Sequence, residues 1–181
     1  MKKEDNILVL KGIRYFLENP HSEVYLREYS RILEISPNTA QRFLELFLKE
    51  KLITDERKAN LRYFKANTEN IVYRQLKIAL SMKEFNDAGI VKYLEKTGVI
   101  SAVLYGSVAK GLDDKESDID LLIISNKKNK LNFNECEKRL GREITSQEYT
   151  LGEWEKIKSS NKAYYQEVMS TGITLIGEKP L

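Results

Sequence analysis

The sequence of 181 residues predicts an α+β protein with two domains. Two observations carry this prediction. Residues 5–49 repeat apolar side chains at the spacing of amphipathic helices. From Gly98 onwards, short apolar runs of strand length alternate with helical segments, which is the pattern of an α/β domain. The chain is long enough for both domains because a domain needs as few as about 50 residues.

Composition limits the classes of function. A net charge of +3 is only mildly basic, so any binding to nucleic acid has to come from local patches. Cys136 is the only cysteine and His21 the only histidine, which excludes a cysteine or multi-histidine metal cluster and leaves oxygen ligands, suited to Mg²⁺ or Mn²⁺. No window approaches the roughly 18 to 20 apolar residues of a membrane span. The N-terminus is too charged for a secretory signal, so we expect a cytoplasmic protein with no membrane partner.

Three helices are predicted before residue 50. The first spans residues 5–18 and stops at Asn19-Pro20, because the residue before proline disfavours the helical conformation. The second begins near Leu26. The third begins with Ser36 as its cap and Pro37 at the first helical position, which proline tolerates best. The outer face of this third helix is polar and includes Thr39, Gln41 and Arg42.

A β-hairpin is predicted after the third helix. The apolar or alternating runs Leu52–Ile53 and Leu61–Lys65 flank the polar segment Asp55–Asn60. The basic residues near its tip are Arg57, Lys58 and Arg62.

Three helices followed by a basic hairpin resemble the winged helix-turn-helix family over residues 1–67. The resemblance implies DNA as a partner, because basic residues of such a hairpin commonly contact phosphates. The residues expected to contact DNA are Thr39, Gln41, Arg42, Arg57, Lys58 and Arg62. Two alternatives stay open, a plain solvated helix face and a protein-interaction module, since the charge on the third helix is mixed.

Residues 68–84 predict a connecting helix with Thr68 as its cap, followed by a second domain at residues 85–181. A helix of this kind serves as a connector or in dimerisation, so a homodimer is one expectation. The predicted strands of the second domain are residues 99–105, 119–124, 142–150 and 173–177, with a helical segment at residues 151–172.

The segment Leu104–Ile124 places two carboxylates at the start of an apolar run. Side chains alternate along a strand, so Asp118 and Asp120 share one face while Ile119 and Leu121 point into the core. Burying such carboxylates is costly unless a cation compensates them. Two carboxylates on one face can hold a magnesium ion, which explains why the chain carries them here.

Gly106 and Ser107 form a turn between the preceding strand and a short helix that we expect to start near Val108. Glycine lets a phosphate approach the backbone closely, and the serine adds a hydroxyl and an N–H group. Lys110 is compatible with two roles, neutralising a phosphate or lying on the surface as an ordinary lysine.

The pattern apolar-Gly-Ser, ten residues, Asp-apolar-Asp-apolar resembles the DNA polymerase beta nucleotidyltransferase superfamily. Within it, residues 85–181 are most similar to the minimal nucleotidyltransferases of archaea and bacteria. The resemblance implies a nucleotidyltransferase fold with a small mixed sheet, in which Gly106, Ser107 and Lys110 bind a nucleoside triphosphate, expected to be ATP. 

The resemblance further implies that Asp118 and Asp120 hold Mg²⁺ or Mn²⁺. It also implies the transfer of a nucleoside monophosphate, AMP in the antitoxins of this family, to a hydroxyl group. A protein such as a partner toxin is then a candidate acceptor.

One position departs from the family pattern. The superfamily supplies a third acidic residue from a neighbouring strand, and Thr145 occupies the matching position here. Glu143 lies two residues earlier on the same face and is the candidate substitute, whereas Glu148 is expected on the opposite face. The departure leaves a second interpretation open, a transcription regulator whose catalytic domain has degenerated into a nucleotide sensor. A transferase acting on RNA or DNA ends ranks last, because it needs a long basic groove and further domains.

Overall fold

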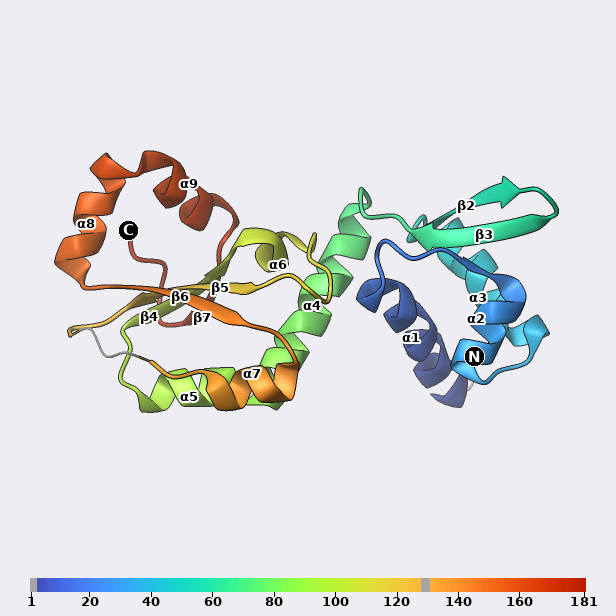
Figure 1. The fold of residues 1–181 in the computed structure, drawn as a ribbon, viewed down its shortest axis with the longest axis horizontal. Coiled ribbons are helices and arrows are strands. Elements are labelled where there is room, and N and C mark those ends of the chain that lie inside the picture. Colours follow the sequence, from blue (N-terminus) through green and yellow to red (C-terminus); the bar gives the residue numbers. More distant parts are fainter. Residues whose placement is uncertain (1–2, 128–130) are drawn as a thin grey trace. The chain divides into compact units, whose positions relative to one another are not determined.

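The structure is a computed structural model that describes residues 3–127 and 131–181 (Figure 1). The chain divides into two compact units, Met1–Lys77 and Ile78–Leu181. The division falls inside helix α4 (Ile71–Ala88), which overlaps the connecting helix predicted at residues 68–84 but begins and ends later. Each unit is described by itself.

The N-terminal unit contains three helices and a three-stranded antiparallel sheet of order β1-β3-β2. Its elements are α1 (Lys3–Glu18), β1 (Val24–Tyr25), α2 (Leu26–Leu33), α3 (Pro37–Lys49), β2 (Ile53–Lys58) and β3 (Leu61–Ala66). Helix α3 begins as predicted, because the Ser36 hydroxyl accepts a hydrogen bond from the Thr39 N–H group at 3.2 Å and Pro37 is the first helical residue. The hairpin is longer than predicted. Strand β2 continues to Lys58, and only Ala59 and Asn60 form the turn.

Aromatic side chains form the core of the N-terminal unit. Phe16 of α1, Tyr29 of α2 and Phe47 of α3 are almost completely buried and pack against one another. The first part of α4 is tied to α1 by two buried donors. The Tyr73 hydroxyl donates to the Phe16 carbonyl and the Lys77 ammonium to the Leu17 carbonyl, each at 2.8 Å. These bonds explain why the unit ends inside α4 rather than at the end of the hairpin.

The C-terminal unit is built on a four-stranded sheet of order β6-β5-β4-β7. Strand β5 runs parallel to β6 and antiparallel to β4, and β4 runs antiparallel to β7, so the sheet is mixed, as predicted. Its strands are β4 (Ser101–Tyr105), β5 (Ile119–Ile124), β6 (Ile144–Tyr149) and β7 (Ile173–Ile176). Its helices after α4 are α5 (Ile90–Lys96), α6 (Gly106–Lys110), α7 (Asn134–Leu140), α8 (Leu151–Ser160) and α9 (Lys162–Thr171).

Helices cover both faces of this sheet (Figure 1). Helices α5 and α7 lie on the face to which Ile119 and Leu121 of β5 point, and these two side chains are fully buried, as predicted. Helices α8 and α9 lie on the other face, where Trp154 packs near Leu122. Asp120 alternates with Ile119 and Leu121, so its side chain belongs to the α8 and α9 face.

Two local predictions need correction. Helix α4 begins at Ile71, and the side chain of Asn70, not of Thr68, accepts the N–H group of Tyr73 at 3.0 Å. The helical segment 151–172 is two helices, because Asn161 interrupts it and its side chain caps the second one. Among the described residues, none of the helices has the length and apolar character needed to cross a membrane.

Candidate active site and nucleic-acid interface

The turn at Gly106 lies against the carboxylate of Asp120. Strand β4 ends at Tyr105, which is paired with Asp120 across the antiparallel ladder. Gly106 then begins α6 with a φ of +74°, a conformation that other residues rarely adopt. A Cβ atom at this position would clash with the Asp120 carboxylate. The two halves of the sequence motif, separated by ten residues, are therefore in direct contact in the fold.

The two carboxylates differ in exposure. The side chain of Asp118 is exposed, whereas that of Asp120 is half-buried. Burial raises the pKa of Asp120 above its ordinary value, and the negative charges of Asp118 and Glu167 raise it further, while the ammonium of Lys110 opposes them. The ionised form of Asp120 is thus poorly compensated by the chain itself, and a cation bound nearby would stabilise it.

Lys110 is held by a residue that the sequence did not single out. Its ammonium lies 2.5 Å from the carboxylate of Glu167, in an ion pair between α6 and α9 whose side chains are 35% and 38% exposed. On α9, Glu167 lies three residues after the half-buried Tyr164 and directly before the fully buried Val168. It therefore lies at the edge of the inward face of this helix. Helical periodicity would have found that face, but only the fold identifies Lys110 as the partner.

The register of β5 and β6 tests the position of the third acidic residue. Thr145 is paired with Asp120 in the parallel ladder, so the residue directly beside the carboxylate is a threonine. Glu143 is exposed just before β6, and its carbonyl accepts the N–H group of Ile119 at 2.9 Å. Glu148 accepts the N–H group of Leu131 at 3.2 Å. In residues 3–127 and 131–181, no group of three or more His, Cys, Asp or Glu side chains is arranged to hold a metal ion.

The site nevertheless fits a magnesium ion that a nucleotide brings with it. Mg²⁺ is commonly held by one or two carboxylates together with substrate phosphates and water, rather than by a complete cage of protein ligands. Asp118 and Asp120 offer two carboxylates, and a cation would offset the burial and the like charges that raise the pKa of Asp120. Glu167, which Lys110 already engages, is not needed for this arrangement.

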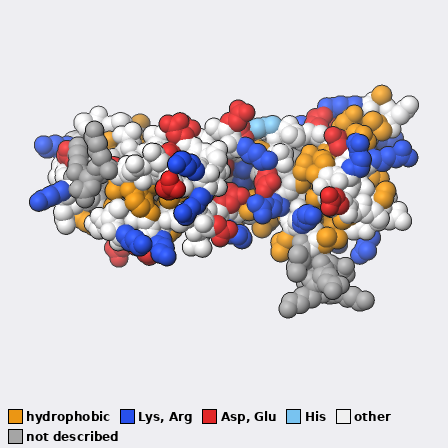
Figure 2. Space-filling model, turned by 60° about the horizontal axis from the view of Figure 1, so that its bottom comes forward, with side chains coloured by type: hydrophobic (Ala, Val, Ile, Leu, Met, Phe, Trp, Pro, Cys, Tyr) orange, Lys and Arg blue, Asp and Glu red, His pale blue; other side chains and the backbone are white. Residues whose placement is uncertain are grey.

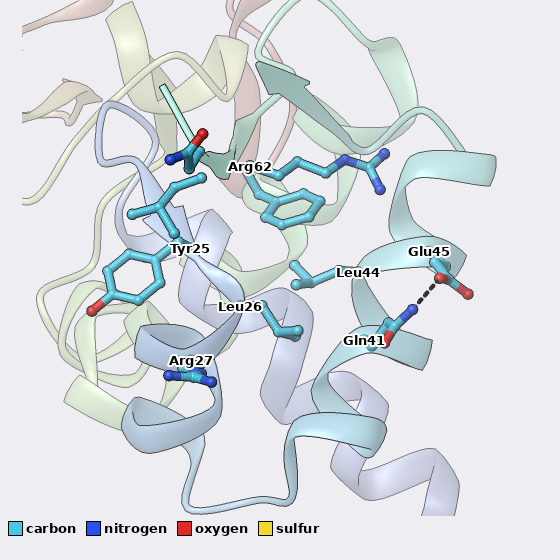
Figure 3. A pocket seen from close by; sticks show the side chains of 10 residues that line it. Tyr25, Leu26, Arg27, Gln41, Leu44, Glu45 and Arg62 are labelled. Carbon is cyan, nitrogen blue, oxygen red and sulfur yellow. Dashed lines mark hydrogen bonds between the residues drawn. The ribbon is translucent and has the colours of Figure 1, made fainter. Parts of the chain in front are cut away.

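A second candidate site lies in the N-terminal unit. A pocket of about 680 Å³ is formed by the start of α2, by α3 and by β3 (Figure 3). Gln41 and Glu45 line it from α3, where the amide of Gln41 donates to the carboxylate of Glu45 at 2.9 Å. Arg62 lines it from the hairpin, with its guanidinium over the ring of Phe64 at 5.1 Å from the centroid. Two residues predicted to contact DNA, Gln41 and Arg62, thus border one pocket.

Two cations of the hairpin are already paired inside the unit. The guanidinium of Arg62 lies 2.7 Å from the carboxylate of Asp55, and the ammonium of Lys58 lies 2.5 Å from that of Glu23. Over the face that Figure 2 shows, described acidic and basic side chains are interspersed. A phosphate bound at Lys58 or Arg62 would have to compete with these carboxylates.

The other predicted DNA contacts are arranged differently. The Thr39 hydroxyl lies 2.9 Å from that of Ser36 at the start of α3. Arg57 lies opposite Arg62 in the hairpin register. Arg42 and Arg57 form no ion pair with any residue that the structure describes, so their charges are the ones most available to an external phosphate.

The C-terminal unit is similar to one known family. The sequence profile of the family described as nucleotidyltransferase domain matches residues 88–171. The match includes Gly106, Ser107, Asp118 and Asp120 and supports the nucleotidyltransferase superfamily, whose domains generally use a nucleoside triphosphate and a divalent metal ion. No curated protein matches the chain.

Proposed function

We propose that the C-terminal unit transfers a nucleoside monophosphate, AMP from ATP, to a hydroxyl group of an acceptor. The observation that carries this proposal is the contact between the Gly106 turn and the Asp120 carboxylate, because phosphates bound at that turn would lie beside a carboxylate able to hold their cation. The family match over residues 88–171 supports the same reaction class.

In this proposal each residue has a defined role. Gly106 has no side chain to obstruct the phosphates, and Ser107 offers its hydroxyl and N–H groups to them. Lys110 neutralises phosphate charge, for which its ammonium exchanges the carboxylate of Glu167 for the phosphate. Asp118 and Asp120 hold Mg²⁺ or Mn²⁺, which when bound stabilises negative charge on the phosphates and on the departing pyrophosphate.

The transfer exchanges one phosphorus–oxygen bond for another. The acceptor oxygen forms a bond to the α-phosphorus while the bond from that atom to the bridging oxygen breaks, and pyrophosphate leaves with the electron pair. The proton of the acceptor hydroxyl has to pass to a base. Glu143 is our candidate for this base. Thr145 offers no carboxylate beside Asp120, and Glu143 lies two residues before Thr145, directly before the start of β6.

The test is label transfer by the full chain. We expect incubation with magnesium and each α-labelled nucleoside triphosphate, with host lysate as the source of acceptor, to label a macromolecule on a gel. Replacing both Asp118 and Asp120 by asparagine should reduce the label by on the order of 10³-fold, since it removes several kcal/mol of charge stabilisation. A labelled protein band would favour a protein acceptor, as in the antitoxin-type relatives.

The matched control removes two carboxylates elsewhere. Glu135→Gln with Glu155→Gln changes the charge equally, at exposed helix positions whose ion pairs, among the described residues, are with lysines three residues on. This control should keep full transfer. Undiminished transfer by the Asp118→Asn, Asp120→Asn variant would refute the assignment of the two carboxylates.

A second candidate function is favoured by one observation, the pairing of Thr145 with Asp120. It is a transcription regulator whose C-terminal unit binds a nucleotide without turning it over. Under this alternative no label is transferred, yet magnesium-dependent nucleotide binding remains measurable by calorimetry and is lost in the Asp118→Asn, Asp120→Asn variant.

For the N-terminal unit we propose a winged helix-turn-helix domain that binds DNA. The order of its elements supports this proposal, since three helices are followed by a two-stranded hairpin. Helix α3 would enter the major groove, and Arg42 and Arg57 would contact phosphates. Titration of a labelled duplex over a range of salt concentrations tests the proposal, because phosphate contacts make affinity fall steeply with salt.

A further inference from the structure

The guanidinium of Arg142 joins two points of the segment that precedes Asp118. Its Nε donates to the Ser117 carbonyl at 2.8 Å, and its Nη1 donates to the carboxylate of Asp113 at 3.0 Å. The side chains of Arg142 and Asp113 are only 10% and 2% exposed. Arg142 lies between α7 and β6, so it approaches this segment from a different part of the chain.

The bonds of Arg142 fall close to the proposed cation site. Asp113 and Ser117 belong to the connection between α6, which begins at Gly106, and β5, and Ser117 directly precedes Asp118. On the other side of Asp118, the N–H group of Ile119 is bound by the carbonyl of Glu143 at 2.9 Å. Two consecutive residues, 142 and 143, therefore hold the backbone immediately before and immediately after Asp118.

The position of the Asp118 carboxylate depends on these two hydrogen bonds to the backbone. Its side chain is exposed and forms no hydrogen bond or ion pair with any residue that the structure describes. Its position relative to Asp120 is set by the backbone alone, and the backbone is fixed by the bonds at Ser117 and Ile119. Changing a residue that holds a metal ligand in place commonly alters the affinity of the metal site.

Stability alone does not account for the buried pair. A buried ion pair can often be replaced by apolar side chains without loss of stability, because removing two charges from water costs as much as their attraction returns. The third nitrogen of Arg142, Nη2, is buried without a hydrogen-bond partner in the described part of the chain, which adds to the cost. Such a pair is better explained by the position that it imposes than by the free energy that it contributes.

We propose that Arg142 is a positioning residue that holds Asp118 at the place where it binds the divalent cation together with Asp120. The inference rests on the proposed function, since it assumes that these two carboxylates hold the cation. It adds a residue from outside the sequence motif to the site, and it makes the α7–β6 connection part of the cation-binding apparatus.

The experiment measures Mn²⁺ binding to the full chain by electron paramagnetic resonance, in the presence of a non-hydrolysable nucleotide, together with the melting temperature. Arg142→Lys keeps a positive charge beside Asp113 but cannot reach both Asp113 and the Ser117 carbonyl. We expect it to weaken Mn²⁺ binding by about 10- to 100-fold. Arg142→Met removes the ion pair with the buried Asp113 carboxylate, so it should also lower the melting temperature.

A double variant separates position from stability. Arg142→Met with Asp113→Asn removes both charges, so its melting temperature should recover towards that of the unmodified chain. If Arg142 positions Asp118, Mn²⁺ binding stays weak in this variant, because the bond to Ser117 is still missing. If Mn²⁺ affinity recovers together with the melting temperature, the pair is only structural and the inference is wrong.

Failure of the proposed function has a different signature. Asp118→Asn with Asp120→Asn should abolish Mn²⁺ binding in the same measurement. Unchanged binding in that variant would place the cation elsewhere and overturn both proposals. Loss of binding in that variant, with unchanged binding in Arg142→Lys, would overturn only the inference on Arg142.

Discussion

The carboxylates at the two candidate sites differ in how the chain compensates their charge. In the N-terminal unit, Asp55 of the hairpin and Glu23 just before β1 each accept a hydrogen bond from a cation of the hairpin, and these bonds lower the pKa of both carboxyls. In the C-terminal unit, burial raises the pKa of Asp120, and the neighbouring Asp118 and Glu167 raise it further. Asp55 and Glu23 are thus compensated by the chain, whereas Asp120 is not.

The difference indicates what each site requires from a ligand. A carboxylate that burial and like charges destabilise gains from any cation that arrives, so the site at Asp120 is suited to a metal–nucleotide complex. A cation that already has a carboxylate partner must exchange that carboxylate for a phosphate. Arg62 and Lys58 therefore contribute less to the free energy of DNA binding than two unpaired cations would. The motif in the C-terminal unit therefore predicts a ligand more strongly than the basic hairpin does.

Among the substitutions that test this comparison, the largest expected effect comes from Gly106. Gly106→Ala forces a side chain into the Asp120 carboxylate and also places alanine at a positive φ. The backbone term costs about 1 kcal/mol. The displacement of Asp120 should in addition reduce Mn²⁺ affinity and label transfer by about 10- to 100-fold.

Gly98 supplies the matched control for that substitution. Its φ is +69°, and a Cβ atom there would meet no atom within 4 Å. Gly98→Ala should show a similar loss of stability and retain Mn²⁺ binding. If both alanine variants bind Mn²⁺ equally well, the contact between Gly106 and Asp120 has no part in the site.

An intermediate effect is expected in the hairpin. Asp55→Asn releases Arg62 from its ion pair, so duplex affinity should rise by about threefold. The slope of the logarithm of affinity against the logarithm of salt concentration should steepen by about 0.9 for one added phosphate contact. Arg57→Ala should change both quantities by similar amounts in the opposite direction. Fluorescence anisotropy of a labelled duplex at several salt concentrations measures both.

A control for the hairpin separates contact from net charge. Glu135→Gln removes the same negative charge from the exposed surface of α7 and should leave duplex binding unchanged. Identical behaviour of Asp55→Asn and Glu135→Gln would mean that the hairpin does not contact the duplex. It would then favour the protein-interaction alternative for the N-terminal unit.

Local patterns in the sequence predicted the parts of the fold that depend on neighbouring residues. Ser36 and Pro37 were sufficient to locate the start of α3, and the alternation around Asp120 was sufficient to assign Ile119 and Leu121 to the core. Both depend on contacts within a few residues along the chain. The mixed sheet followed from the family resemblance rather than from any local pattern.

The ion-pair partners of the charged residues could not be predicted from the sequence. Lys110 and its partner Glu167 are 57 positions apart, and Arg142 and Asp113 are 29 apart, so only the packing of α9 and of the α7–β6 connection brings them together. For this reason the sequence could not decide whether Lys110 neutralises a phosphate or is an ordinary surface lysine. The position of Thr145 was predicted from the resemblance, and the ladder places it beside Asp120.

The smallest expected effect is on stability, and it has opposite signs in the two units. Because the folded state raises the pKa of Asp120, ionisation of this carboxyl destabilises the fold at neutral pH, and that penalty disappears as the pH falls through the raised pKa. Asp120→Asn should therefore raise the melting temperature at pH 7, by about 1 to 2 °C, even though it abolishes Mn²⁺ binding. The gain should vanish at low pH, where the native carboxyl is protonated as well.

Asp55→Asn should behave in the opposite way, because the folded state lowers the pKa of Asp55. Its ionised form stabilises the fold above the ordinary pKa, so the asparagine variant should melt at a slightly lower temperature at pH 7 and match the unmodified chain at low pH. Calorimetry of both variants across this pH range measures the contrast. A melting temperature that falls in Asp120→Asn at pH 7 would mean that the chain itself compensates Asp120, and the argument that this carboxylate needs a cation from a ligand would lose its basis.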